Sequence, residues 1–217
     1  MAKNAGREIV NWLWISGWAV PPAWLAVQAQ AAWPRENHAA VTPMDAAQAL
    51  SAEKFDVLGG YSLGALWLLR QAKAIPENVP VVLLAPILAF TEESGCGGRV
   101  ARAQLQLQRR RLRAQPTAAI ADFFQRAGLA ELNELPSIAE WNAPLTAALN
   151  EELGWLEDWS VSTVPKNWHG FIGDNDPLLD ALALKKIWSS LHIVSGATHA
   201  PGLLMAAAKK FLSNITP

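Results

Sequence analysis

The sequence holds a single cysteine, Cys96, among 217 residues, and this scarcity excludes a disulfide within the chain. A chain without disulfides fits a reducing compartment, so we expect a cytoplasmic location. The formal net charge is only −1, so no overall field attracts nucleic acid or a membrane surface. No apolar run reaches the roughly 18 residues that a membrane-spanning helix needs. No His, Cys and Asp spacing indicates a metal site, and we expect neither a metal nor another cofactor.

Hydrophobic residues make up 51% of the chain, which is enough for one sizeable core. Short apolar runs alternate with segments that favour helix. The runs that we expect to form strands are residues 10–16, 38–43, 55–60, 79–86, 167–173 and 189–196. Strands that alternate with helices are typical of an α/β protein, in which helices cover both faces of a mostly parallel sheet.

A long helical stretch interrupts this alternation. Apolar residues recur there with helical spacing, for example at Leu145, Leu149, Leu153 and Leu156. An insertion between two strands of an open sheet suggests a cap over the carboxyl ends of the strands, where ligands bind. We therefore predict a core of residues 1–86 and 165–217 and a helical cap of residues 87–164.

The pattern G-x-S-x-G occurs where a predicted strand gives way to a predicted helix, as Gly60-Tyr61-Ser62-Leu63-Gly64. In a tight strand-to-helix turn the serine backbone is strained, and larger residues at the two glycine positions would clash. The backbone N–H of Leu63 would then lie at a helix N-terminus, where it can stabilise an oxyanion. The motif therefore predicts that Ser62 is a nucleophile.

A serine nucleophile needs a base, and that base needs an orienting carboxylate. The histidines that follow Ser62 are His169, His192 and His199. His169 and His192 fall inside predicted strands, whereas His199 lies in the loop "SGATHAPG" after the last strand. A loop at the carboxyl end of a strand can reach the turn, so we predict that His199 is the base.

The acid is expected at the end of the preceding strand, in "FIGDNDPLLD". Asp174 suits a turn, and Asp180 would fall on the next helix. Asp176 lies three residues beyond Gly173, which leaves room for a short turn before it. We favour Asp176 as the acid and keep Asp174 as the alternative.

Four segments, "ISGWAVPPAW", "LGGYSLGALW", "LEDWSVSTVPKNWHGFIGDNDPLL" and "GATHAPGL", resemble the α/β-hydrolase family in its own order across most of the chain. The resemblance implies an α/β-hydrolase fold with a reduced number of strands. It implies Ser62 as nucleophile, His199 as base and Asp176 as orienting acid. It also implies that the backbone N–H groups of Trp18 and Leu63 form the oxyanion hole, without a cofactor.

Within that family, the chain most resembles the pimeloyl-[acyl-carrier protein] methyl ester esterases of biotin synthesis, through Gly17-Trp18 and a small helical cap. The family usually has His where this chain has Ser16, and some members have Gly where it has Ala19. The resemblance implies a methyl ester on an acyl-carrier protein as substrate. The alternatives are a general small-ester or thioester hydrolase, or a non-catalytic protein that binds a ligand with this fold.

The predicted cap holds seven arginines between Arg99 and Arg126, opposed there only by Asp122, and the stretch that follows is acidic. One interpretation is that the two halves form surface ion pairs, each worth about 0–1 kcal/mol. The other is a docking surface for an acidic acyl-carrier protein or a phosphopantetheine phosphate. The candidate docking residues are Arg109, Arg110 and Arg111.

Overall fold

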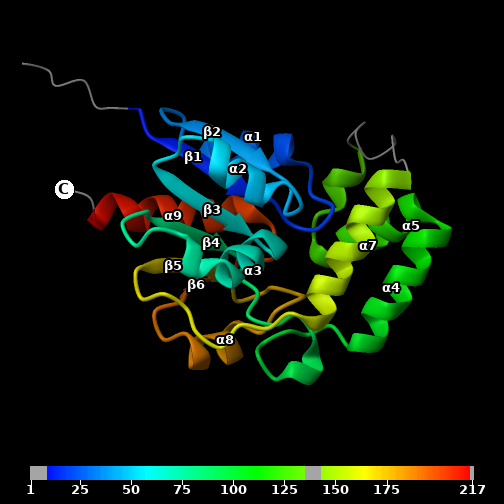
Figure 1. Ribbon diagram of the computed structural model, residues 1–217. Helices are drawn as coiled ribbons and strands as arrows, with labels where there is room; N and C mark the ends of the chain where they lie inside the picture. The colour runs from blue at the N-terminus through cyan, green and yellow to red at the C-terminus, as the bar shows by residue number, and fades with distance from the viewer. Residues whose placement is uncertain (1–8, 135–142, 216–217) are drawn as a thin grey trace, which may run out of the picture.

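A six-stranded parallel sheet forms the centre of the computed structural model, which describes residues 9–134 and 143–215 (Figure 1). The sheet order is β2-β1-β3-β4-β5-β6, and each neighbouring pair is parallel. The strands are β1 (Asn11–Ile15), β2 (Asn37–Val41), β3 (Val57–Tyr61), β4 (Val81–Leu84), β5 (Trp168–Gly173) and β6 (His192–Val194). Each overlaps one of the predicted runs, so the predicted α/β class is confirmed.

Helices cover both faces of this sheet (Figure 1). α1 (Pro22–Ala32) and α9 (Pro201–Ile215) lie together on one face, whereas α3 (Leu63–Arg70) packs against β1 and β3 on the other. The shorter elements of this part are α2 (Ala46–Ala52), α8 (Ala181–Ile187) and the 3₁₀ turns η1 (Ala72–Ala74) and η2 (Glu92–Ser94).

The sheet is apolar because its central strands are covered on both faces. All four residues of β4 are buried, which explains why the run Val81–Leu84 shows no alternation of polar and apolar residues. In β1, Trp12 and Trp14 lie two residues apart and so share a face, where their rings stack with centroids 5.1 Å apart. Because all six strands are parallel, their carboxyl ends lie at the same edge of the sheet.

A group of helices, here called the helical layer, separates β4 from β5 in the chain. It consists of α4 (Arg102–Ala114), α5 (Pro116–Ala127), η3 (Ala130–Glu134) and α7 (Ala143–Asp158), and Figure 1 shows it in green to yellow beside the sheet. It falls within the predicted cap of residues 87–164. The predicted domain boundaries themselves stay a prediction, and residues 135–142 of that range lie outside the described residues.

The helical layer is held by the apolar faces that the sequence spacing predicts. Ile120 and Phe124 of α5 are fully buried, as are Leu153 and Leu156 of α7. Both α5 and α7 belong to one layer because α4 packs against each of them. This packing gives α7 a fixed position from which its side chains can face the sheet.

Two histidines of the sheet pack against α9, so this contact contains titratable groups. The rings of His169 on β5 and His192 on β6 lie 4.7 Å and 4.4 Å from the ring of Phe211, measured between centroids. Burial lowers the pKa of both, and the charges of His169 and Lys185 lower that of His192 further. Protonation of either ring would therefore weaken the packing of α9 on the sheet.

We predict that the contribution of His169 and His192 to the free energy of unfolding decreases as the pH falls below about 6.5, where histidines of the unfolded chain take up protons. Folded His169 and His192 take up protons only at lower pH, so the stability present at pH 7 is lost through that window. Urea unfolding at about pH 7.5 and pH 5.5 measures this loss. It should be smaller in His169→Gln/His192→Gln, and an undiminished loss in that variant would contradict the assignment.

Candidate active site

Ser62 lies on a sharp turn between β3 and α3, with backbone angles φ 55° and ψ −114°. A positive φ is strained for a residue with a side chain, so close packing must hold the turn. At Gly60 an added Cβ would lie 2.8 Å from the Cα of Ala65, and at Gly64 it would lie 2.1 Å from the carbonyl oxygen of Ile15. The turn therefore requires glycine at both positions.

His199 lies in the loop between β6 and α9, and its ring reaches Ser62. The distance from His199 Nε2 to Ser62 Oγ is 2.9 Å, which is a hydrogen bond. The buried hydroxyl of Tyr61 holds the same loop, because it donates to the backbone carbonyl of His199 at 3.1 Å. Burial, and then the charge of Asp176, raises the pKa of Tyr61 well above its ordinary value, so this hydroxyl stays a donor.

Asp176 completes the arrangement on the other side of the imidazole. Its Oδ2 lies 2.8 Å from His199 Nδ1, and its Oδ1 accepts the backbone N–H groups of Leu178 at 2.8 Å and Leu179 at 3.0 Å. Arg99 fixes the same turn by donating to the backbone carbonyl of Asp176 at 2.9 Å. Both carboxylate oxygens are therefore satisfied, and one of them is directed at the imidazole.

The other candidate acids have structural positions. Asp174 is exposed, and its Oδ1 accepts the backbone N–H of Gly196 at 2.8 Å. Asp180 is the N-cap of α8, where it accepts from the first turn and where the backbone donor of Ala183 chiefly lowers its pKa. The structure thus brings Asp176, and neither of these two residues, to His199.

The predicted oxyanion donors are the backbone N–H groups of Trp18 and Leu63, the residues that follow Gly17 and Ser62. Leu63 opens α3, so its N–H belongs to a first turn that lacks intrahelical partners. Trp18 follows Gly17, where an added Cβ would lie 3.2 Å from Ser62 Cβ. Neither N–H has an acceptor among residues 9–134 and 143–215, so both can donate to a developing oxyanion.

The side chain of Trp18 joins this loop to the helical layer. Its indole Nε1–H donates to the backbone carbonyl of Leu149 on α7 at 2.9 Å. Its ring meets the ring of Phe123 on α5 edge to face, with centroids 4.7 Å apart. The loop that carries one predicted oxyanion donor is therefore held by two helices of the layer.

The three polar side chains are almost completely buried. Ser62 is 6% exposed, His199 1% and Asp176 0%. Ser16, which precedes the Gly17–Trp18 pair, is also buried, and its Oγ has no partner in the described part of the chain. Such a site is shielded from bulk water, which strengthens the electrostatic interactions within it.

Two contacts at the site were not anticipated from the sequence. Tyr61 was identified only as a member of the motif, although it is the single tyrosine of the chain and adjoins Ser62. Arg99 was counted with the arginines of the predicted cap, yet it holds the turn that carries Asp176. Their partners lie 138 and 77 residues away, so no local spacing could reveal these contacts.

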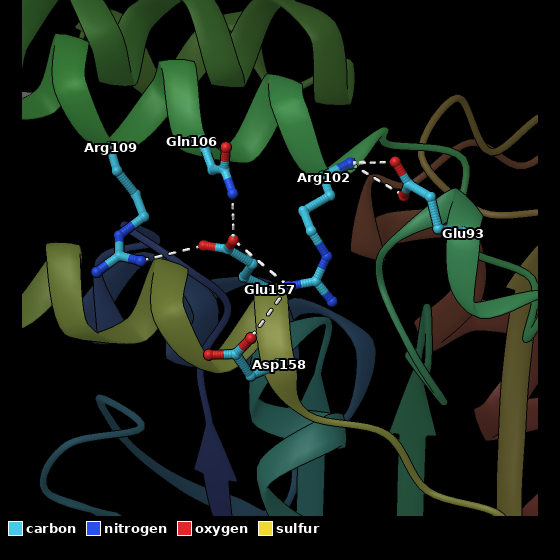
Figure 2. A network of polar contacts seen from close by, with 6 residues as sticks. All are labelled: Glu93, Arg102, Gln106, Arg109, Glu157 and Asp158. Carbon is cyan, nitrogen blue, oxygen red and sulfur yellow. Dashed lines mark hydrogen bonds and ion pairs between the residues drawn. The ribbon is translucent and has the colours of Figure 1, made fainter.

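Four arginines of the helical layer form ion pairs within it, and Figure 2 shows two of them, Arg102 and Arg109. Arg109 and Arg102 on α4 reach Glu157 on α7 at 3.0 Å and 3.4 Å, and Arg102 also reaches Asp158 at 3.1 Å. The hydrogen bond from Gln106, followed by the hydrogen bond and charge of Arg109 and the charge of Arg102, lowers the pKa of Glu157. These contacts lie between α4 and α7 and hold the two helices together.

Only part of the predicted docking group therefore points to solvent. Arg111 pairs with Asp122 on α5 at 3.0 Å, so it bridges α4 and α5. Arg110 is exposed and makes no ion pair with any described residue. Of the three predicted docking residues, Arg109 and Arg111 fit the ion-pair interpretation, whereas Arg110 lacks an ion pair within the described residues.

Away from these residues, the described part of the chain holds one hollow of note and no candidate metal site. A hollow of about 1310 Å³ lies at the amino ends of the strands, lined by Trp12, Trp33 and His169 among others, and includes none of the three polar site residues. Within residues 9–134 and 143–215, no three His, Cys, Asp or Glu side chains gather in a way that could hold a metal ion. Among these residues, no helix combines the length and the apolar character that a membrane span requires.

No protein-family model and no curated protein sequence matches the chain. Solved structures, in contrast, match the chain in fold. An esterase from Exiguobacterium antarcticum has a TM-score of 0.71 at 11% identity, over 95% of this chain and 90% of the other. A hydrolase from Pseudomonas aeruginosa PA01 has a TM-score of 0.66 at 14% identity, over 96% of this chain and 91% of the other.

A third neighbour catalyses a different reaction. The bottromycin epimerase, solved in complex with bottromycin A2, has a TM-score of 0.66 at 12% identity, over 97% of this chain and 92% of its own. At such identities the likeness concerns the fold, and the activity must be argued from the site. With its parallel sheet, its helices on both faces and these neighbours, the chain has the α/β-hydrolase fold.

Proposed function

We propose that this chain is a serine hydrolase that cleaves a carboxylic ester through an acyl-enzyme. The observation that carries the proposal is the unbroken hydrogen-bonded path from Ser62 Oγ through the imidazole of His199 to Asp176 Oδ2, with steps of 2.9 Å and 2.8 Å. Such a path is what an unreactive serine hydroxyl needs for activation. The esterases and hydrolases among its structural neighbours support an ester as the substrate class.

Acylation starts when Ser62 Oγ attacks the ester carbonyl while His199 Nε2 takes its proton. Asp176 accepts from Nδ1–H, which fixes the tautomer and stabilises the imidazolium. The carbonyl oxygen becomes an oxyanion, and the N–H groups of Trp18 and Leu63 donate to it. The tetrahedral intermediate then collapses, and Nε2–H gives its proton to the leaving alcohol.

Deacylation repeats these steps with water as the nucleophile. His199 Nε2 removes a proton from the water, and the water oxygen attacks the acyl carbonyl. When this second tetrahedral intermediate collapses, Nε2–H returns the proton to Ser62 Oγ and the carboxylic acid leaves. The near-complete burial of Ser62 and His199 restricts this site to the water that enters with or after the substrate.

A binding protein with the same fold is the competing function. The hydrogen-bonded path argues against it, because a protein that only binds a ligand has no use for an activated serine. A fluorophosphonate probe separates the two functions: the hydrolase is labelled at Ser62, and a binding protein is not labelled.

We predict that Ser62→Ala and His199→Ala each reduce the kcat of ester hydrolysis by about 10³-fold or more, because each removes a member of one catalytic unit. The double variant should be hardly slower than either single variant, since the two losses are not additive. Steady-state kinetics on a small chromogenic ester measures all three. Near wild-type turnover by Ser62→Ala would refute the mechanism.

Asp176→Asn should lower kcat by about 10⁴-fold, because an amide cannot hold the imidazole in the required tautomer. Asp174→Asn is the matched control: it is the same substitution two residues away, on an exposed side chain that only accepts from Gly196. This variant should retain most of its activity. If Asp174→Asn, and not Asp176→Asn, loses most of its activity, the assignment of the acid is wrong.

A more specific proposal concerns the identity of the ester substrate. The resemblance to pimeloyl-[acyl-carrier protein] methyl ester esterases supports a carrier-bound methyl ester as the substrate to test first. An acidic carrier would meet α4, where Arg110 is exposed without an ion pair in the described part of the chain. General small esters and thioesters are the other substrates of the same chemistry.

For that carrier-bound ester, Arg110→Glu should lower kcat/KM by about two- to tenfold at low salt and by less at high salt, where charges are screened. The kcat/KM for a small neutral ester should stay unchanged. Arg109→Glu is the control, because it breaks the pair with Glu157 and should impair both substrates through the helical layer. No response of the carrier-bound ester to Arg110→Glu or to salt would exclude docking on α4.

A further inference from the structure

Glu152 on α7 is a buried acid that the proposed mechanism does not use. It is 2% exposed, and its Oε2 has no hydrogen-bond partner in the described part of the chain. Carboxyl groups are rarely buried in this way without partners, because they lose their hydration without compensation. Among the described residues this oxygen is left without a donor, so it can accept one from a ligand.

Glu152 lies close to the oxyanion loop. The indole of Trp18 donates to the carbonyl of Leu149, and the buried residues three and four positions after Leu149 lie on the same face of the helix. In α7 these residues are Glu152 and Leu153. Because Gly17, the residue before Trp18, lies against Ser62, one short segment connects the nucleophile to the turn of α7 that carries Glu152.

The charges around Glu152 are negative. Burial, followed by the charges of Asp45 before α2 and Glu151 on α7, raises the pKa of Glu152 to about 8. No arginine, lysine or histidine of the described residues forms an ion pair with it. At pH 7 the carboxyl is thus protonated in the protein alone, and what its surroundings lack is a positive charge.

We infer that Glu152 binds an amino group carried by the ester substrate, an inference that rests on the serine hydrolase function proposed above and is an alternative to the carrier-bound pimeloyl ester. The ammonium supplies the missing positive charge and donates an N–H to Oε2. As it binds, the carboxyl releases its proton to water and pairs as a carboxylate. Glu152 thereby selects which ester is placed beneath α7, and it takes no part in bond cleavage.

The first test compares three methyl esters with the same pentamethylene chain: methyl 6-aminohexanoate, methyl heptanoate and the monomethyl ester of pimelic acid. Their chains end in an ammonium, a methyl group and a carboxylate. We expect kcat/KM to be highest for the ammonium ester, by about tenfold or more over the methyl-ended one, and lowest for the carboxylate. Because deprotonation of Glu152 favours pairing, this preference should increase between about pH 6 and pH 8.

Glu152→Gln keeps the size of the side chain and removes the charge. The ratio of kcat/KM between the ammonium and methyl-ended esters should fall to about one in this variant. Glu151→Gln is the matched control, since Glu151 is the exposed neighbour on the same helix. It should keep most of the wild-type ratio.

A second test needs no turnover. In Ser62→Ala, carbon-13 NMR of the Glu152 carboxyl follows its titration directly. Methyl 6-aminohexanoate should lower the midpoint from about 8 by at least about one pH unit, whereas methyl heptanoate should leave it in place. An unchanged midpoint at saturating ammonium ester would overturn the inference even if the protein hydrolyses esters.

The outcomes separate the inference from the proposed function. If the esters are hydrolysed without preference and Glu152→Gln lowers kcat/KM equally for all, Glu152 is structural and the hydrolase function stands. If no ester is hydrolysed and Ser62 resists the fluorophosphonate, the hydrolase function fails, and the NMR titration still decides what Glu152 binds. Fastest hydrolysis of the carboxylate-ended ester would also overturn the inference.

Discussion

The close approach of α3 to β1 at Gly64 is the constraint on which the rest of the site depends. The backbone of Ile15 occupies the space where a side chain at position 64 would begin. Together with the close packing at Gly60, this contact allows the strand β3 to turn into a helix directly beside the end of β1. The nucleophile and the Gly17–Trp18 segment, which are distant in sequence, thereby become neighbours.

The parallel sheet extends that constraint to the remaining residues of the site. Every strand ends at the same edge, so the loops after β5 and β6 bring Asp176 and His199 to the turn after β3. The buried polar groups are tolerated because they satisfy one another and the backbone N–H groups of Leu178 and Leu179. The parallel sheet thus brings four loops that are separate in the sequence together at one candidate site.

Much of this arrangement was predictable from the sequence, because its signals are local. The glycines around Ser62 reflect the sterics of one turn, and the position of His199 after an apolar run places it at a strand end. The strands were recognisable for the same reason, since β4 is a continuous apolar run. The choice between Asp174 and Asp176 was not local, because it depends on which carboxylate the β5–α8 turn directs inward.

The contacts that escaped the sequence join distant segments through single atoms. Arg109 and Glu157 are 48 residues apart, and composition alone could not tell a paired arginine from a free one such as Arg110. Glu152 resembled any other acid on an amphipathic helix, because burial of one face depends on what packs against it. Only the assembled fold distinguishes it from exposed Glu151.

The hydrogen bond between the Trp18 indole and the Leu149 carbonyl has a consequence for how such a protein can evolve. Trp18 contributes a backbone N–H to the predicted oxyanion hole and a side chain to the anchorage of α7. A change on α7 that moves the Leu149 carbonyl would therefore also move Trp18, and misplacement of a catalytic group by about 1 Å can cost about 10²-fold in rate. The position of α7 and the position of the predicted donor are therefore coupled through this one hydrogen bond, so a change in the first is expected to require a compensating change around Trp18.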